Sequence, residues 1–257
     1  MMLSGFARSV AMATLLWWPL SGCSSEGAAE KPALLLMTSL PLQYGEASLE
    51  ERLDGQGGAP LPAFERLADR YNIRSLDTLN DLDGAKRGVL LLAQPRALSP
   101  PELVALDEWL RAGGKALILA DPALTWPSDY PLGDARRPLF TSLLSPLFAH
   151  WGIELVLPMD EARETVERTV DGLTLETSTP GAFLPLPDGG TPAADCDVGA
   201  QPSFMAICTV GQGKAMLLAD ADLLQARWWQ GGAPLNLTGD RRENMMLIER
   251  LIDRLSA

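Results

Sequence analysis

Polar side chains follow several apolar runs of this chain, at the positions where each run ends. The runs 33–37, 88–93, 115–120 and 214–219 are rich in Ala, Val, Leu, Ile and Met, the pattern of strands buried on both faces of a sheet. Carboxyl ends of parallel strands meet at one edge, where open α/β folds bind ligands. The candidate ligand or partner residues at that edge are Thr38, Ser39, Gln94, Asp121, Asp220 and Asp222.

The three aspartates among these residues could do two kinds of chemistry. Together they could coordinate a hard cation such as Ca²⁺ or Mg²⁺, or act as acid and base if burial separated their pKa values. The alternative, which we favour, is that Asp121 and Asp222 cap turns and helices by accepting backbone hydrogen bonds. We therefore expect no metal site and no cofactor, a divalent cation remaining the alternative, and the catalytic residues stay unknown.

A catalytic nucleophile is hard to find in the chain. His150 is the single histidine, so it alone could serve as base in a Ser-His-Asp triad. It lies in an apolar helical stretch beside Trp151, and it has no Cys or His partner at zinc-ligand spacing. We interpret His150 as a packed or surface residue.

The N-terminal segment reads as an export signal. Arg8 precedes an apolar run over 10–20, which ends in Leu20-Ser21-Gly22-Cys23. This ending resembles a lipobox, whose cysteine is acylated and becomes the first residue after cleavage. We expect a signal peptide over 1–22, lipidation of Cys23 and a tether over 23–31. An ordinary cleaved signal or a short uncleaved helix stays open, but the run is about half the roughly 20 residues needed to cross a bilayer.

Charge and cysteine content agree with an exported protein. The net charge of −12, with basic residues scattered among acidic ones, argues against a nucleic-acid partner. With Cys23 acylated, Cys196 and Cys208 remain, an even pair that predicts a disulfide in an oxidising compartment. Two reduced buried thiols are the alternative. By the lipoprotein sorting pattern, Ser24 in place of Asp favours the outer over the inner membrane.

The order of elements predicts an α/β domain over 32–257. Ser99, Pro100 and Glu102 form a capping box at the start of a helix that Gly113-Gly114 ends. Asp171-Gly172 marks a β-hairpin within a predicted insertion over 158–213, and 214–257 completes the core. We further expect helices over 62–71 and 139–151, the second kinked at Pro146, strands over 73–76, 153–157 and 204–210, loops over 41–61 and 179–201, and Asp240 as the cap of the last helix.

Aromatic residues mark two further segments near the predicted edge. Trp228 and Trp229 lie on a Gly-rich stretch after the last strand, where they could be interface anchors or local core, and we leave both open. The segment 121–138, with Trp126 and Tyr130, is either a lid over the same edge or plain packing. Both segments leave carboxyl ends of strands, so we expect them to be neighbours.

The order of these motifs resembles a known family. The motifs are Thr38–Leu42, the stretch from Gly88 to Pro122, the stretch from Gly211 to Leu224 and the hexapeptide at 239–244. They resemble the periplasmic domain of gliding-motility-type ABC-transporter auxiliary proteins and a related uncharacterised exported domain. The resemblance implies a flavodoxin-like three-layer sandwich, shared with class I glutamine amidotransferases, with a mostly parallel central sheet and a small antiparallel β insertion.

The catalytic relatives in that comparison carry a nucleophile on a sharp strand-to-helix turn. Here the strand exits carry Gln94, Asp121 and Asp220, with neither Cys nor Ser on such a turn. The resemblance thus implies a non-catalytic lipoprotein of the bacterial envelope, facing the periplasm, that assists an ABC transport system. Its partners would be the membrane, through the lipid, and transporter subunits or another envelope protein. The alternative is a hydrolase or other enzyme that uses Asp121, Asp220 and Asp222.

Overall fold

The computed structural model describes residues 1, 30–45, 49–55, 58–82, 88–134, 136–159, 165–186, 192–199, 202–229 and 243–257. Lys31–Ala257 form one unit and Met1–Glu30 another. The predicted signal peptide, Cys23 and nearly all of the tether therefore lie outside the described residues. Among the described helices, none is long and apolar enough to span a bilayer.

Seven strands form the central sheet: β1 (Ala33–Thr38), β2 (Asn72–Ser75), β3 (Val89–Ala93), β4 (Lys115–Leu119), β9 (Asp195–Asp197), β10 (Met205–Val210) and β11 (Gly213–Leu218). Their spatial order is β2-β1-β3-β4-β11-β10-β9. The first five strands in this order, β2, β1, β3, β4 and β11, are parallel to one another. Strand β10 is antiparallel to β11, and β9 is antiparallel to β10. The five parallel strands thus follow the flavodoxin-like order 2-1-3-4-5, which confirms the expected fold class.

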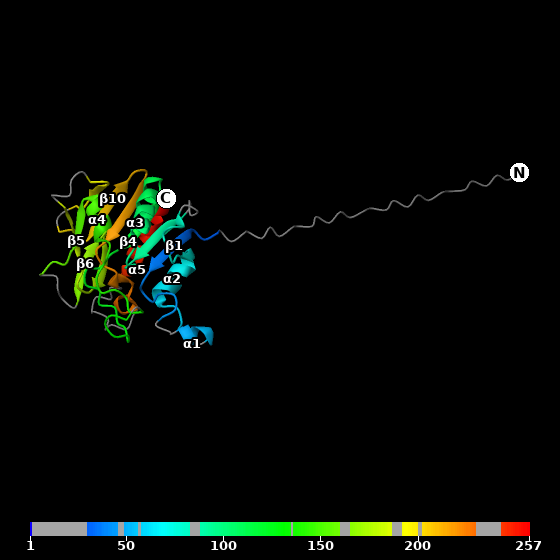
Figure 1. Cartoon of the computed structure of the whole chain (residues 1–257). Helices are drawn as coiled ribbons and strands as arrows, with labels where there is room; N and C mark the ends of the chain where they lie inside the picture. The colour runs from blue at the N-terminus through cyan, green and yellow to red at the C-terminus, as the bar shows by residue number, and fades with distance from the viewer. Residues whose placement is uncertain are drawn as a thin grey trace. The chain divides into compact units, whose positions relative to one another are not determined.

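Helices cover both faces of this sheet: α1 (Leu49–Leu53), α2 (Pro62–Arg70), α3 (Pro100–Arg111), α4 (Ser145–Trp151) and α5 (Asn244–Ser256). Strand β3 is buried at every residue, as a strand covered on both sides must be. Helix α5 packs on β3 and β4, and α3 packs on β10 and β11 from the opposite side (Figure 1). Helix α2 lies beside α5, to which the Arg66–Glu249 ion pair joins it at 2.6 Å.

The predicted capping box at the start of α3 is present. The buried carboxylate of Glu102 accepts hydrogen bonds from the main-chain N–H of Ser99 at 2.9 Å and from its hydroxyl at 2.8 Å. After the helix, Gly113 has a φ of 105°. A Cβ on Gly114 would lie 2.4 Å from the ring of Trp109. The two glycines are therefore needed for different reasons, one for backbone conformation and one for close packing.

Two small antiparallel sheets flank the central one. The predicted hairpin joins β6 (Val166–Val170) to β7 (Leu173–Thr177) through Asp171 (φ 58°) and Gly172 (φ 75°), the left-handed pair of a two-residue turn. The other sheet pairs β5 (Ile153–Val156) with β8 (Ala182–Pro185). The prediction of a plain loop over 179–201 was wrong, because this segment supplies β8 and β9.

Other boundaries also differ from the sequence-based expectation. The helix predicted over 139–151 begins only at Ser145, and Pro146 lies in its first turn, where the missing N–H costs nothing. The loop predicted over 41–61 contains α1. Helix α5 begins at Asn244, and the expected cap Asp240 lies outside the described residues.

Cys196 and Cys208 form the predicted disulfide. They are direct partners in the antiparallel register of β9 and β10, so their Cα atoms lie 4.0 Å apart. This is closer than the separation of about 5.5 Å that is common for disulfides. The bridge ties the edge strand β9 to the sheet.

Candidate functional site

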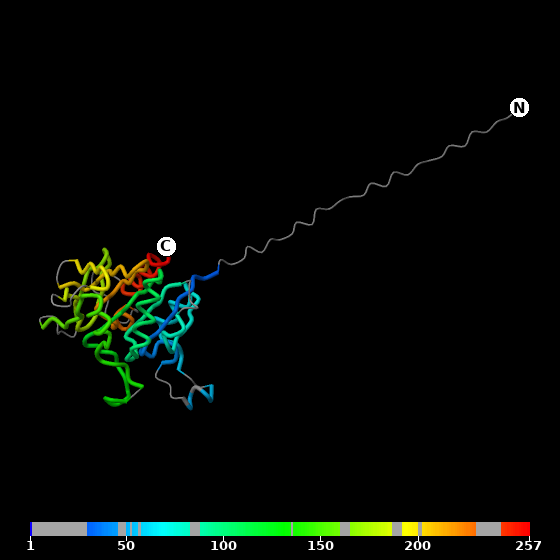
Figure 2. Tube along the Cα trace, turned by 45° about the horizontal axis from the view of Figure 1, so that its top comes forward, coloured from blue at the N-terminus to red at the C-terminus, as the bar shows by residue number. Residues whose placement is uncertain are grey.

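The strand exits of the sheet bring the predicted residues together at one edge. Thr38 ends β1, Gln94 follows β3, and Asp121 and Asp220 lie just beyond β4 and β11. These four strands are consecutive in the sheet. The segments that follow β1 and β4 extend from this same end of the sheet (Figures 1 and 2). We call this end the carboxyl edge.

At the first two exits, polar groups bind each other. The main-chain N–H of Ser39 donates to the carbonyl of Gln94 at 3.1 Å, and its hydroxyl donates to the same oxygen at 2.5 Å. The hydroxyl of Thr38 accepts the N–H of Leu40 at 2.9 Å. In the strand order 2-1-3-4-5, ligands bind at the switch point between β1 and β3. Here the groups that would recognise a ligand at that point are engaged within the protein.

Gln94 continues this arrangement toward β4. Its side chain is fully buried and accepts the N–H of Asp121 at 2.9 Å while donating to the carbonyl of Asp121 at 3.2 Å. It also donates to the carbonyl of Leu139 at 3.0 Å. Its backbone has a φ of 40°, a left-handed conformation that is uncommon for a residue other than glycine. Gln94 therefore acts as a fixed link between two strand exits.

Asp121 joins the exits of β4 and β11. One carboxylate oxygen accepts the N–H of Ala123 at 2.8 Å, and the other accepts the N–H of Ala221 at 3.1 Å. The carboxylate is fully buried. Both of its oxygens thus cap main-chain turns, which is the alternative that the sequence favoured over catalysis.

Asp220 and Asp222 are held in the same manner, and both are fully buried. Asp220 accepts the N–H of Leu223 at 3.1 Å and bonds to the hydroxyl of Thr177. One oxygen of Asp222 accepts the N–H and the hydroxyl of Thr125, at 2.9 and 2.6 Å, and the other bonds to the amide of Gln225. All six oxygens of the three carboxyl groups therefore have hydrogen-bond partners from the protein.

Burial changes the acid–base behaviour of these three groups. It raises the pKa of Asp121, Asp220 and Asp222, because the charged form loses its hydration. Neighbouring carboxylates raise the pKa of Asp121 and Asp220 further. A cation could relieve this repulsion, but the N–H and O–H donors already point their hydrogens at the oxygens it would need. Within the described segments, no group of three or more His, Cys, Asp or Glu is arranged to hold a metal ion.

The two tryptophans lie next to this cluster and are half-buried. The guanidinium of Arg227 lies 4.3 Å from the ring centre of Trp228, and that of Arg66 lies 5.9 Å from the ring of Trp229. Trp229 also packs against the core. Both indole N–H groups are buried without a hydrogen-bond partner in the described part of the chain. The pair thus combines packing with a partly exposed aromatic surface.

The segment 121–138 and the tryptophan segment are neighbours, as expected. Arg227 donates to the hydroxyl of Thr125 at 2.9 Å, and Thr125 in turn binds Asp222. Trp126 is buried, so it packs rather than forming an exposed lid. Sequence reasoning missed Thr125, Thr177 and Gln225, because a lone threonine or glutamine carries no signal until the fold brings it beside an aspartate.

Part of the chain matches a known protein family. Residues 31–157 match the family described as an ABC-type uncharacterized transport system. Over these residues, the chain is similar to this family. The match covers the parallel strands β1 to β4 and the Gln94–Asp121 link. The matched family indicates an accessory protein of an ABC-type transport system, and such an association points to the cell envelope. None of the curated proteins matches the chain.

Solved structures resemble the chain only distantly. The mmIFT52 N-terminal domain has 14% identity and a TM-score of 0.49, with 88% of this chain and 97% of that chain covered. Cytoplasmic Protein STM3548 from Salmonella typhimurium has 10% identity and a TM-score of 0.45, with 75% and 85% covered. The exo-β-1,4-mannosidase Op5Man5 from Opitutaceae bacterium strain TAV5 has 12% identity and a TM-score of 0.41, with 77% of this chain but 33% of that chain covered.

Proposed function

We propose that this protein is a non-catalytic lipoprotein that assists an ABC-type transport system by binding one of its subunits. The observation that carries the proposal is that all six oxygens of Asp121, Asp220 and Asp222 accept or share hydrogen bonds within the protein. A catalytic carboxylate must reach the reacting atoms. Carboxylates buried among their own donors serve better as supports for the loops above them.

The lipid anchor rests on the sequence ending in Cys23. The tether from Cys23 to Lys31 spans eight peptide steps, at most about 28 Å when extended. Lys31 precedes β1, whose carboxyl end lies at the opposite end of the sheet. The folded domain therefore begins at the end of the sheet opposite the carboxyl edge.

The contact surface of this proposal is the carboxyl edge. Leu132 and Phe140 lie on the segment that leaves β4, and their side chains are 80% and 66% exposed. Phe140 is held close to β4, because its carbonyl accepts the N–H of Leu124 at 2.8 Å. Apolar side chains within an acidic domain suit a partner with an apolar centre and a basic rim. Trp228 and Trp229 would add aromatic area beside them.

Photo-crosslinking tests this surface. The photoreactive analogue p-benzoylphenylalanine replaces Phe140 with little change of shape, and a matched control places it at Val104, which is exposed on α3. In living cells, the analogue at Phe140 should crosslink to a transporter subunit, and the one at Val104 should not. Equal crosslinking from both positions, or none from Phe140 in protein that is correctly exported and folded, would remove the carboxyl edge from the proposal.

A further inference from the structure

Strand β2 forms the edge of the central sheet opposite β9. Among the described strands, β2 has a sheet partner, β1, on one side only. The N–H of Asn72 donates to Pro32 and that of Leu76 to Leu36, both at 2.8 Å. Because backbone groups alternate in direction along a parallel strand, the N–H and C=O groups of Ile73 and Ser75 point away from β1. Within the described segments these outward groups have no partner.

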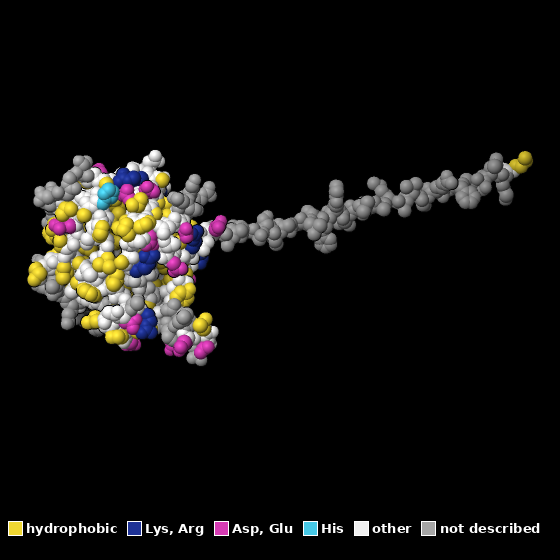
Figure 3. All heavy atoms as spheres, in the orientation of Figure 1, with side chains coloured by type: hydrophobic (Ala, Val, Ile, Leu, Met, Phe, Trp, Pro, Cys, Tyr) yellow, Lys and Arg dark blue, Asp and Glu magenta, His cyan; other side chains and the backbone are white. Residues whose placement is uncertain are grey.

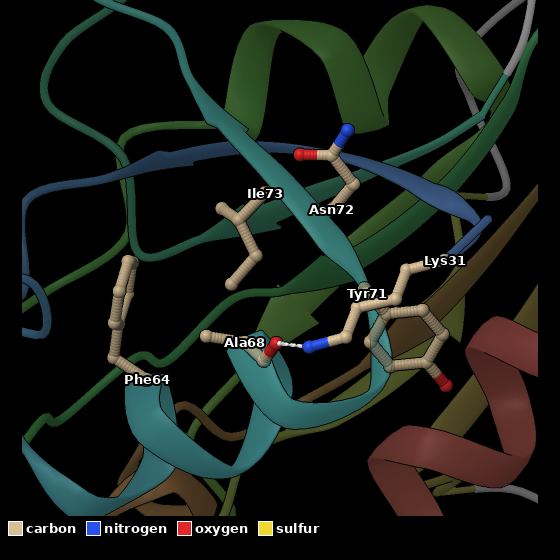
Figure 4. A pocket seen from close by; sticks show the side chains of 6 residues that line it. All are labelled: Lys31, Phe64, Ala68, Tyr71, Asn72 and Ile73. Carbon is tan, nitrogen blue, oxygen red and sulfur yellow. Dashed lines mark hydrogen bonds between the residues drawn. The ribbon is translucent and has the colours of Figure 1, made fainter. Parts of the chain in front are cut away.

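A groove runs beside this strand, between β2 and α2. It has a volume of about 500 Å³ and is lined by Lys31, Phe64, Ala68, Tyr71, Asn72 and Ile73. Figure 4 shows Phe64 and Ala68 on α2 facing Ile73 on β2, while Lys31 reaches across to the carbonyl of Ala68, a contact of 2.7 Å. Phe64, Ala68 and Ile73 are half-buried. Helix α2 therefore presents apolar side chains beyond β2, where the described part of the chain has no further strand.

Two basic residues, Lys31 and Arg74, lie along this edge. Arg74 is exposed and has no ion pair or hydrogen bond within the part of the chain that the structure describes. The Lys31 ammonium binds a carbonyl oxygen, a neutral partner. By contrast, Arg66 and Arg70 on the neighbouring helix are paired with Glu249 and Asp253. Two cations without carboxylate partners in a chain of net charge −12 favour an acidic occupant.

We infer that the outer edge of β2 binds an extended acidic segment of a partner protein, which adds to the sheet as an extra strand. Its main chain would pair with the outward groups of Ile73 and Ser75, and alternate apolar side chains would enter the groove. The carboxylates that alternate with these apolar side chains would lie on the other face of the sheet, beside Arg74, and a carboxylate at the end of the groove would meet Lys31. This inference depends neither on the lipid anchor nor on the carboxyl edge.

Charge also argues against a second copy as the occupant. Two copies that paired through β2 would bring two sets of Lys31 and Arg74 together, and like charges on neighbouring strands are unfavourable. A small molecule is a poor occupant for a different reason. The outward main-chain groups of Ile73 and Ser75 are spaced along a strand, and an extended peptide can bind both of them whereas a small molecule cannot.

The test selects linear decapeptides from a phage-displayed library on the domain, followed by fluorescence-polarisation titrations of the enriched peptides. Ser75→Pro removes one outward N–H without touching the β1 ladder, and Ser75→Ala is its matched control. The enriched peptides should alternate apolar and acidic residues. They should bind Ser75→Pro at least tenfold more weakly than wild type, and Ser75→Ala as well as wild type. Equal binding to Ser75→Pro, or no enrichment over a carrier control, would overturn the inference.

A second pair of variants keeps the test decisive if Ser75→Pro fails to fold. Ala68→Glu places a negative charge in the groove from the helix side, and Arg74→Glu reverses the charge of the edge, with Arg74→Lys as its control. Both Glu variants should weaken the same peptides at least tenfold, and Arg74→Lys should not. Bound peptide should also slow hydrogen exchange over 72–76. If sedimentation instead shows a wild-type dimer that Ser75→Pro dissociates, a second copy fills the edge and the inference is wrong.

Discussion

The side-chain amide of Gln94 binds both main-chain groups of Asp121, at 2.9 Å to the N–H and 3.2 Å to the carbonyl. The amide thus satisfies the main-chain N–H and carbonyl of Asp121, just beyond β4, in place of a neighbouring backbone. The same residue binds Ser39 through its own carbonyl. Three neighbouring strand exits are thus held by one side chain and its main chain, so the residues that looked like a ligand site form an internal brace.

Removal of this brace should destabilise the domain. In Gln94→Ala, the main-chain groups of Asp121 and the carbonyl of Leu139 lose their buried partners, at a cost of about 2–4 kcal/mol in the free energy of unfolding. Urea denaturation measures this change. The control is Gln43→Ala, because Gln43 bonds to Ser75 near the surface. Similar losses of less than about 0.5 kcal/mol for both variants would contradict the assigned role.

The buried aspartates predict a loss of stability toward alkaline pH. Burial raises the pKa of Asp121 to about 8, and the pKa of Asp220 is raised well above its ordinary value. The folded state therefore holds protons that the unfolded state has released above pH 4, so the free energy of unfolding should fall as pH rises from about 4 to 8. The slope is at most about 1.4 kcal/mol per pH unit for each such proton.

Asp220→Asn tests the origin of this slope. An asparagine keeps an acceptor for the N–H of Leu223 and cannot ionise, so the variant should gain stability relative to wild type at pH 8 and flatten the dependence on pH. Asp54→Asn, at an exposed position, should leave the dependence unchanged. A slope that is the same in wild type and Asp220→Asn would exclude Asp220 as its source.

Glu102 predicts the opposite dependence at acid pH. Arg96 lies 2.6 Å from its carboxylate and, together with the Ser99 donors, holds its pKa well below the usual range. The folded state thus binds fewer protons than the unfolded state, and this stabilisation is lost as pH falls below about 4.5. Glu102→Gln should cost about 2 kcal/mol at pH 7 and much less at pH 2. Glu108→Gln, at an exposed position on the same helix, should cost little at either pH.

The disulfide should contribute through the unfolded chain. It closes a loop between Cys196 and Cys208, whose separation is 12 residues. On the chain-entropy account, reduction should lower the free energy of unfolding by about 3 kcal/mol. Urea titrations with and without dithiothreitol measure the difference, and the Cys196→Ser/Cys208→Ser double variant should not respond to the reductant. An equal response of the double variant would show that dithiothreitol acts elsewhere.

Local signals were sufficient for much of the fold. The apolar runs of β3 and β4, the capping box at Ser99 and the Asp171-Gly172 turn each depend on residues close together in the chain, so sequence alone predicts them. Strands β8 and β9 carry no such pattern. They are short, and their pairing depends on partners in β5 and β10 that are distant in sequence. The apolar spacing upstream of Pro146 resembles that of a helix, so the sequence predicts Pro146 in a helix interior, whereas it lies in the first turn of α4.

The candidate site was predictable in position but not in chemistry. The exits of parallel strands share an edge by topology, so Gln94, Asp121 and Asp220 could be placed together from sequence. Whether an aspartate is free or capped depends on donors such as Thr177 and Thr125, which come from the β insertion and from a long loop. Only the folded chain shows that these donors engage the carboxylates.

Association with transporter subunits is the central claim, and co-purification from solubilised envelopes tests it most directly. Tagged wild-type protein should recover the membrane-spanning and nucleotide-binding subunits of one ABC transporter, and the Trp228→Ala/Trp229→Ala variant should recover at least tenfold less while remaining folded and exported. Repeated recovery of the intact wild-type protein without any transporter subunit would contradict the account.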